Sequence, residues 1–432
     1  MQLPEKAGGE QSVFHEPSYA RFWFVRICAM VSFQMVAVAV GWQMYALTHS
    51  TFALGMVGLV QFLPMLLLTL VVGHVADHVD RKKILVVCQL VDCATVSLLA
   101  ASSYLHRLHP AGIFLAVAAI GTARAFEFPA MQAILPSLVE DRKVPQAIAW
   151  SASAGQAASI AGPALGGLLY VFGAHVPYAT CACLYVSAAL LSSTLVQKRR
   201  TAGKGPVTAQ SIFLGFRFIR DHKNILGAIS LDLFAVLLGG ATALLPAYAR
   251  DILHTGPWGL GLLRLSPAIG ALSMSVYLGH HPIRKRAGHR MFAAVILFGL
   301  ATIAFALSRN VLVSMAILSV LGAADVISVV VRSSLVQLET PDEMRGRVSA
   351  VNALFIGTSN QLGEFESGVT ASWWGLIPAT IVGGVGSIVV ALLWMGWFPG
   401  LRKLESIAGQ KKMEPLAPLE AEAEKEEAAS SM

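Results

Sequence analysis

Long apolar stretches follow one another along almost the whole chain, and only short polar breaks separate them. A helix needs about 20 predominantly apolar residues to cross roughly 30 Å of hydrocarbon, so each stretch is long enough to span a bilayer. Only 13% of the residues are charged, against roughly 25% in an ordinary soluble domain. The sequence therefore excludes a water-soluble fold and predicts an all-α integral membrane protein.

The apolar windows predict twelve transmembrane helices, six on each side of a polar, basic break. The first window is too long for a cleaved signal peptide, so we expect it to remain as a span. The expected spans are 22–47, 53–76, 84–105, 111–136, 146–172, 176–197, 225–249, 258–280, 291–307, 311–336, 347–372 and 376–398. The expected organisation is a cytoplasmic N-terminal segment at 1–21, a six-helix half at 22–197, a cytoplasmic central loop at 198–224, a second half at 225–398 and a disordered acidic tail at 399–432.

Most lysines and arginines fall on the side that would carry both termini, whereas the opposite side keeps only Arg107, Arg250 and Arg309. By the positive-inside rule, this asymmetry predicts that both termini are cytoplasmic.

The two halves show a weak internal repeat. A shift of about 200 residues aligns Gly162 with Gly363. The same shift aligns Gly167 with Gly368. Together with the matching pattern of spans, these identities predict two pseudo-symmetric halves.

The break after the second window reads GHVADHVDRKKIL, in which a glycine, an acid and a basic cluster follow at fixed spacing. This segment resembles the signature loop of the major facilitator superfamily, although Asp80 stands where a second glycine is commoner. The resemblance implies a loop that latches the two halves in one conformation; the alternative is a turn with basic membrane anchors. The latch residues would be Gly73, Asp77, Arg81, Lys82 and Lys83.

The fifth window contains GPALGG, which is similar to the end of a motif associated with antiporters of that superfamily. Proline bends a helix and glycines let a partner backbone approach, so a structural kink and an export marker are both open. The residues concerned are Gly162, Pro163, Gly166 and Gly167.

Three stretches of the second half, at 230–253, 261–272 and 325–368, resemble one branch of the superfamily. This branch is the transmembrane secretion effectors, with enterobactin exporter-like and macrolide efflux-like members. The resemblance implies the major facilitator fold and an exporter, and it does not name the cargo.

Charged side chains within spans are costly unless they face protein or water. In the superfamily, helices 1, 4, 7 and 10 line the central cavity, and most of these charges lie on those helices. Arg124 with Glu127, and Asp325 with Arg332, share helix faces and could form ion pairs, either structural or functional. The candidates for coupling or cargo are Arg26, Arg124, Glu127, Asp232, Asp325, Arg332 and Glu364.

Finer expectations apply to single residues. Arg124 and Asp325 lie nearest to mid-membrane and are favoured, whereas Arg26 and Arg332 are expected to reach lipid headgroups. Glu364 is either a helix contact or a proton carrier. Asp92 and Arg264 lie off the cavity helices, so we expect them to be structural.

The chain has no phosphate-binding loop and no metalloprotease or serine-hydrolase motif. We therefore predict a monomeric transporter of the cell inner membrane, not an enzyme, with no cofactor, metal or nucleic-acid partner. Its partners would be a small-molecule cargo, an ion gradient and the lipid bilayer. Proton-driven export of a siderophore or an amphiphilic drug is the predicted function; the alternatives are an uptake symporter and a non-transporting membrane sensor.

Overall fold

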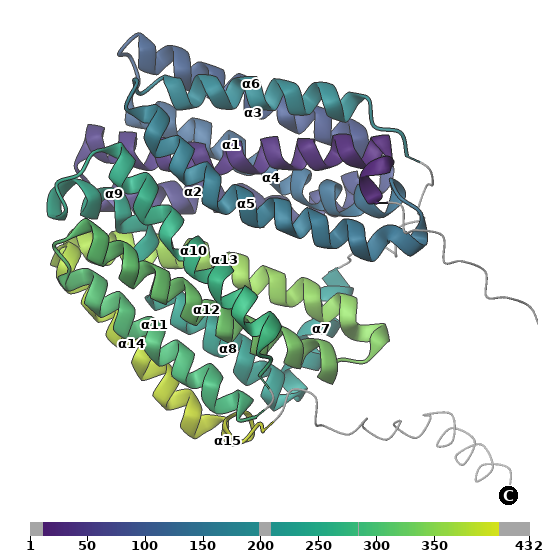
Figure 1. Cartoon of the computed structure of the whole chain (residues 1–432), viewed down its shortest axis with the longest axis vertical. Coiled ribbons are helices and arrows are strands. Elements are labelled where there is room, and N and C mark those ends of the chain that lie inside the picture. The colour runs from purple at the N-terminus through teal and green to yellow at the C-terminus, as the bar shows by residue number, and fades with distance from the viewer. Residues whose placement is uncertain (1–11, 198–208, 284, 406–432) are drawn as a thin grey trace, which may run out of the picture.

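A computed structural model describes residues 12–197, 209–283 and 285–405. The described residues form helices and no strand, as an all-α membrane protein requires (Figure 1). The predicted acidic tail lies mostly outside the described residues.

The first half consists of six helices. Proline occupies one of the first two positions of α1, α4, α5 and α6, where its missing N–H costs nothing. The Ser50 hydroxyl caps α2 by accepting a hydrogen bond from the Ala53 amide at 3.3 Å. The helices are α1 (Pro17–Thr48), α2 (Thr51–His78), α3 (Arg81–Tyr104), α4 (Pro110–Ile134), α5 (Val144–Tyr170) and α6 (Val176–Ser193).

The second half follows the same plan, with one broken helix. The seventh predicted span is built from α8 (Lys223–Leu238), a 3-10 turn, α9 (Leu245–Ala247) and a π-helical turn (Tyr248–Ile252). The remaining helices are α10 (Pro257–His280), α11 (Ala287–Leu307), α12 (Val311–Glu339), α13 (Asp342–Trp374), α14 (Leu376–Trp397) and the short α15 (Pro399–Arg402).

The central break holds a helix that the sequence analysis treated as loop. This helix, α7 (Ala209–Asp221), packs against α13 and α8. Its Ile219 is buried, whereas Phe213 is 65% exposed. An amphipathic helix this short carries too few apolar residues to register as a span, which is why the expectation of a loop was wrong.

Within the described part of the chain, ten helical segments are long and apolar enough to cross a membrane. Two more long helices, α5 and α13, are not among the ten, because small residues dominate α5 and charged residues occur along α13. They occupy equivalent places in the two halves, so for these two the twelve-span prediction depends on symmetry.

The two halves form two bundles that meet mainly along two contacts, α5 with α10 and α2 with α13, and more sparsely where α1 contacts α9 and α10. In Figure 1 the bundles draw apart towards the side on which α7 lies. The contacts concentrate near the end where α1 ends and α2 begins, which we call the predicted outer end.

Glycines make both contacts possible. A Cβ atom on Gly167 would lie 2.9 Å from the Cα atom of Gly261 on α10. In the other half, a Cβ atom on Gly368 would lie 2.6 Å from the Cα atom of Gly55 on α2. Because aligned glycines make equivalent contacts, the predicted internal repeat is confirmed.

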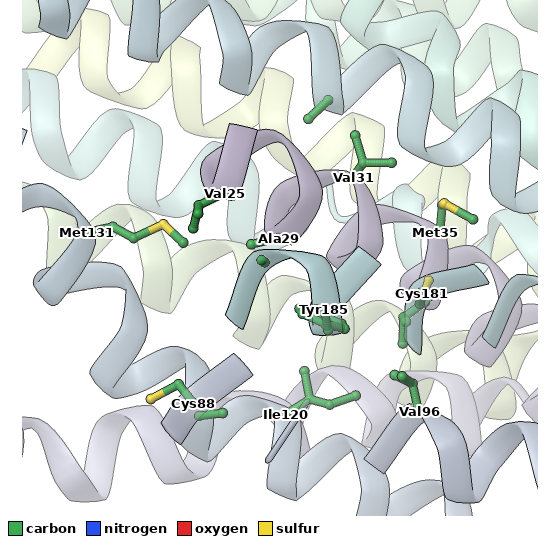
Figure 2. Packing of buried hydrophobic residues seen from close by; sticks show 14 of the residues in the cluster. Val25, Ala29, Val31, Met35, Cys88, Val96, Ile120, Met131, Cys181 and Tyr185 are labelled. Carbon is green, nitrogen blue, oxygen red and sulfur yellow. The ribbon is translucent and has the colours of Figure 1, made fainter. Parts of the chain in front are cut away.

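Each half has its own apolar core. Figure 2 shows part of the first core, in which α1, α3, α4 and α6 pack around buried Tyr185. Next to it, the Tyr178 hydroxyl donates to Gln43 Oε1 at 2.8 Å, and Gln43 Nε2 donates to Ser103 Oγ at 2.9 Å. Hydrogen bonds between these side chains therefore join α1, α3 and α6 inside the first half.

Candidate functional site

Arg124 of α4 faces α1. Its guanidinium lies 3.7 Å from the centre of the Phe33 ring, a cation–π contact between the two helices. Among the described residues no ion pair joins Arg124 to Glu127, so the pairing considered from the sequence is absent.

Glu127 instead turns into the first half, where it is only 4% exposed. Its Oε1 accepts a hydrogen bond of 3.2 Å from Gln89 on α3, and Gln89 accepts one of 2.9 Å from Ser192 on α6. Buried Asp92 lies one turn along α3 from Gln89. Glu127 thus faces α3 and α6, not the other half, which differs from the expectation that it lines a central cavity.

Arg26 is held by the protein near the start of α1. Its Nε donates to the carbonyl oxygen of Ser151 on α5 at 3.1 Å. Arg26 is thus bound to α5 through Nε, and its reach to lipid headgroups stays a prediction.

Asp232 of α8 and Arg332 of α12 form a buried ion pair inside the second half. They are 6% and 2% exposed. The sequence suggested that Arg332 would pair with Asp325 or reach headgroups, and both suggestions are wrong. Spacing along α12 could not show that α8 brings a different acid closer.

Asp325 has no ion pair with Arg124 or Arg332 among the described residues. It lines, together with Asp232 and Ser328, a small cavity of about 10 Å³ whose other walls are apolar side chains of α8, α11 and α12. This volume is close to the minimum for one water molecule. Two carboxyl groups, one already paired with an arginine, therefore face one small space.

Glu364 and Gln361 of α13 lie against α2 of the other half. A Cβ atom on Gly58 would lie 2.7 Å from Glu364 Oε2 and 3.4 Å from Gln361 Oε1. Arg264 of α10 interacts electrostatically with Glu364. Arg264 was expected to be a structural residue away from the cavity, and its place at the junction of the halves was missed. A charge in the middle of a predicted span was the one signal available.

The latch residues can be placed only in part. Gly73 and Asp77 belong to α2, but the side chain of Asp77 is not part of what the structure describes. Arg81 Nη1 donates to the carbonyl oxygen of Ala133 on α4 at 2.9 Å, and Lys82 and Lys83 follow in the first turn of α3. The described part of this loop is thus bound to its own half, and its latch function stays a prediction.

The GPALGG segment of α5 serves two contacts at once. Gly162 and Gly166 face α1, where Cβ atoms would lie 2.5 Å from Gln34 Cβ and 3.1 Å from Met35 Cα. The Pro163 carbonyl and Gly167 face Gly261 on α10. The segment therefore packs α5 within its half and also against the other half.

A polar contact that the sequence did not indicate closes the predicted outer end. The Tyr45 hydroxyl, near the end of α1, donates a hydrogen bond to the Asp251 carboxylate in the π-helical turn. Single π-helical turns are frequent at functional sites. Beside this bond, a Cβ atom on Gly41 would lie 3.2 Å from the Pro246 ring.

Comparison with known sequences gives one family. The sequence model described as "Transmembrane secretion effector" matches residues 9–428. The enterobactin exporter EntS of Citrobacter koseri is 25% identical over 394 residues, which cover 90% of this chain and 93% of the relative. The enterobactin exporter EntS of Escherichia coli O1:K1 is 23% identical, covering 91% and 95%.

Solved structures share the fold at low sequence identity. The nucleoside transporter NupG (D323A mutant) superposes with a TM-score of 0.72 at 14% identity, covering 88% of this chain and 100% of that chain. A bacterial homologue of the iron transporter ferroportin in an inward-facing state gives a TM-score of 0.67 at 18% identity, covering 89% and 99%. These likenesses show the arrangement of helices, and with it the predicted fold.

Proposed function

The chain belongs to the transmembrane secretion effector family and is a multi-pass membrane transporter of the major facilitator type, and from this premise we propose that it exports a moderately large organic molecule in exchange for protons. The cargo class is a siderophore or an amphiphilic compound. Relatives named as enterobactin exporters, similar over nearly their whole length, support the siderophore class.

Alternating access between the halves is the proposed mechanism. The observation that carries it is the pair of glycine contacts, Gly167 with Gly261 and Gly55 with Gly368, which join the two bundles near one end. Backbones that touch without interlocking side chains can part without unpacking a core. The hydrogen bond from Tyr45 to Asp251 would hold this end closed while cargo enters from the other.

Asp325 is the proposed proton carrier. Asp232 is held by Arg332, whereas Asp325 faces the same small cavity without an arginine partner among the described residues. A carboxyl group in such a place can take up a proton at a lower energetic cost than one bound to a guanidinium. Arg124 and Arg26 of the first half would contribute positive charge towards an anionic cargo.

The remaining assignments follow the sequence. Both termini would be cytoplasmic in the cell inner membrane, the protein would act as a monomer, and residues Gly73, Asp77, Arg81, Lys82 and Lys83 would latch the halves at the cytoplasmic side. A cysteine introduced at Lys285 should be labelled only from the cytoplasm, and one at His254 only from outside.

The test is transport by the purified protein in proteoliposomes, with enterobactin as the first cargo. An imposed pH gradient should drive enterobactin uphill, and Asp325→Asn should abolish this while preserving exchange of labelled for unlabelled enterobactin. Loss of exchange as well would make Asp325 a cargo residue. Uphill transport at the wild-type rate in Asp325→Asn would exclude it as the proton carrier, and accumulation in the opposite direction would indicate an uptake symporter.

A further inference from the structure

Three polar side chains lie in the region where helices of both halves converge. Arg264 comes from α10, and Gln361 and Glu364 come from α13, all in the second half. They face glycines of the first half: a Cβ atom on Gly41 of α1 would lie 4.0 Å from Arg264 Nη2, and one on Gly58 of α2 would lie 2.7 Å from Glu364 Oε2. We call these five residues the four-helix junction.

Two atoms of the four-helix junction lack hydrogen bonds. Arg264 Nε and Gln361 Oε1 are buried and make none with any described residue. A buried polar atom without a partner is costly, and in native proteins such an atom calls for an explanation. A ligand that accepts a hydrogen bond from Arg264 Nε and donates one to Gln361 Oε1 would satisfy both atoms.

Arg264 has an acidic neighbour, Glu364, but forms no ion pair with it. Arg264 and Glu364 interact electrostatically with each other. Among the described residues, however, no ion pair of 4.0 Å or less joins them. A guanidinium is a planar fork that matches an acidic oxygen pair, and this one keeps its donors free for such a group.

We propose that Arg264 binds an acidic group of the cargo, a carboxylate or a phenolate, that Gln361 Oε1 accepts a hydrogen bond from a neighbouring N–H or O–H group of the same cargo, and that Glu364 competes for Arg264 when this subsite is empty. The proposal rests on the proposed transport function. It gives the cargo a chemical feature, an anionic oxygen group, and it gives Gly58 a reason, since a Cβ atom there would lie 2.7 Å from Glu364 Oε2. Glu364, which stands where the first half has Pro163, then has a function specific to the second half.

Binding of a matched pair of fluorescent probes tests this subsite. Dansylglycine carries a carboxylate and dansylglycinamide the neutral amide, with the same ring system. The purified full chain in nanodiscs should bind the acid more tightly than the amide. Arg264→Gln should weaken binding of the acid about tenfold or more, because a hydrogen bond to a charged group is lost, and should leave the amide unchanged.

Glu364→Gln is the sharper test, because it should change the affinity for dansylglycine in the opposite direction to Arg264→Gln. Removing the competing carboxylate should tighten binding of dansylglycine several-fold and leave dansylglycinamide unchanged. Glu366→Gln, two residues along the same helix, is the matched control and should change neither. Since Glu364→Gln keeps the size of the side chain, it tests the subsite even where Arg264→Gln fails to fold.

The proposal is overturned if the wild type binds the two probes equally or binds neither. It is also overturned if Glu364→Gln binds the acid more weakly than the wild type does. Enterobactin flux measured on the same preparations separates the two hypotheses. Flux with equal probe binding removes the subsite and keeps the transporter function. Selective binding of the acid without flux of any cargo removes the proposed function and keeps an anion site.

Discussion

The two halves repeat one backbone plan but bury their polar groups differently. At the α5 and α10 contact, Pro163 and Gly167 present backbone atoms to the other half, whereas at the α2 and α13 contact Glu364 stands in the place of Pro163. Inside the first half Glu127 rests on neutral Gln89, whereas inside the second Asp232 pairs with Arg332. The two halves therefore share their close backbone contacts, whereas the partners of their buried charged side chains differ.

The largest expected effect concerns the buried charges. Asp232→Ala should lower the free energy of unfolding by about 3–5 kcal/mol, because it leaves the Arg332 guanidinium buried without its partner. Thermal unfolding of the purified protein in detergent measures this. Glu127→Gln, at a buried acid of the first half, should cost about 1 kcal/mol or less, since its hydrogen-bond partner Gln89 is a neutral amide.

A double variant sharpens the same comparison. Asp232→Ala combined with Arg332→Met should recover much of the stability, because a buried ion pair replaced by apolar side chains is often neutral. If Glu127→Gln were as damaging as Asp232→Ala, the contrast between the halves would be lost.

Some kinds of contact could be predicted from the sequence and others could not. The helices, the repeat and the aligned glycines Gly167 and Gly368 were predictable, because apolar length and small residues report directly on spans and on close backbone approach. The partner of Arg332 was not. Neighbours on one helix can be read from spacing, whereas Asp232 lies on another helix, about 100 residues away.

Arg264 is a second residue whose neighbours could not be predicted from the sequence. Its helix is not one of the four expected to line the cavity, so its charge was interpreted as structural. The contact of α10 with α1 and α5 places it at the boundary between the halves. Which residues meet across that boundary is set by the packing of two bundles, and no local pattern records it.

The second prediction addresses the glycine contacts. Gly167→Val should destabilise the joined form of the halves by about 1–3 kcal/mol, the usual cost of overpacking, because backbone atoms of Pro257 and Gly261 leave no room for a side chain. Transport rate and thermal unfolding measure the effect. Gly368→Val should match it closely, since Gly55 approaches Gly368 in the same way.

Gly279→Val is the control for both variants. Gly279 also lies in α10, but no atom within 4 Å would meet its Cβ, so this variant should transport at close to the wild-type rate. A strong effect at Gly167 with none at Gly368 would show that the two contacts are not equivalent.

The smallest expected effect concerns the bond that closes the predicted outer end. Tyr45→Phe removes the hydrogen bond to Asp251 without removing the ring. Because Asp251 is exposed to solvent, we expect a loss of about 1 kcal/mol, below the roughly 1.5–3 kcal/mol of hydrogen bonds to charged groups, which shifts the balance between closed and open outer ends about fivefold. Spin labels at Arg107→Cys and Arg309→Cys, exposed positions in the two halves, report this shift as a larger share of long distances.

Tyr248→Phe is the matched control, since its hydroxyl donates to Thr380 Oγ1 at 2.9 Å within the second half and its loss leaves the contact between the halves intact. If the two variants gave the same distance distribution as the wild type, the bond from Tyr45 to Asp251 would have no part in closure, and the glycine contacts alone would hold the outer end.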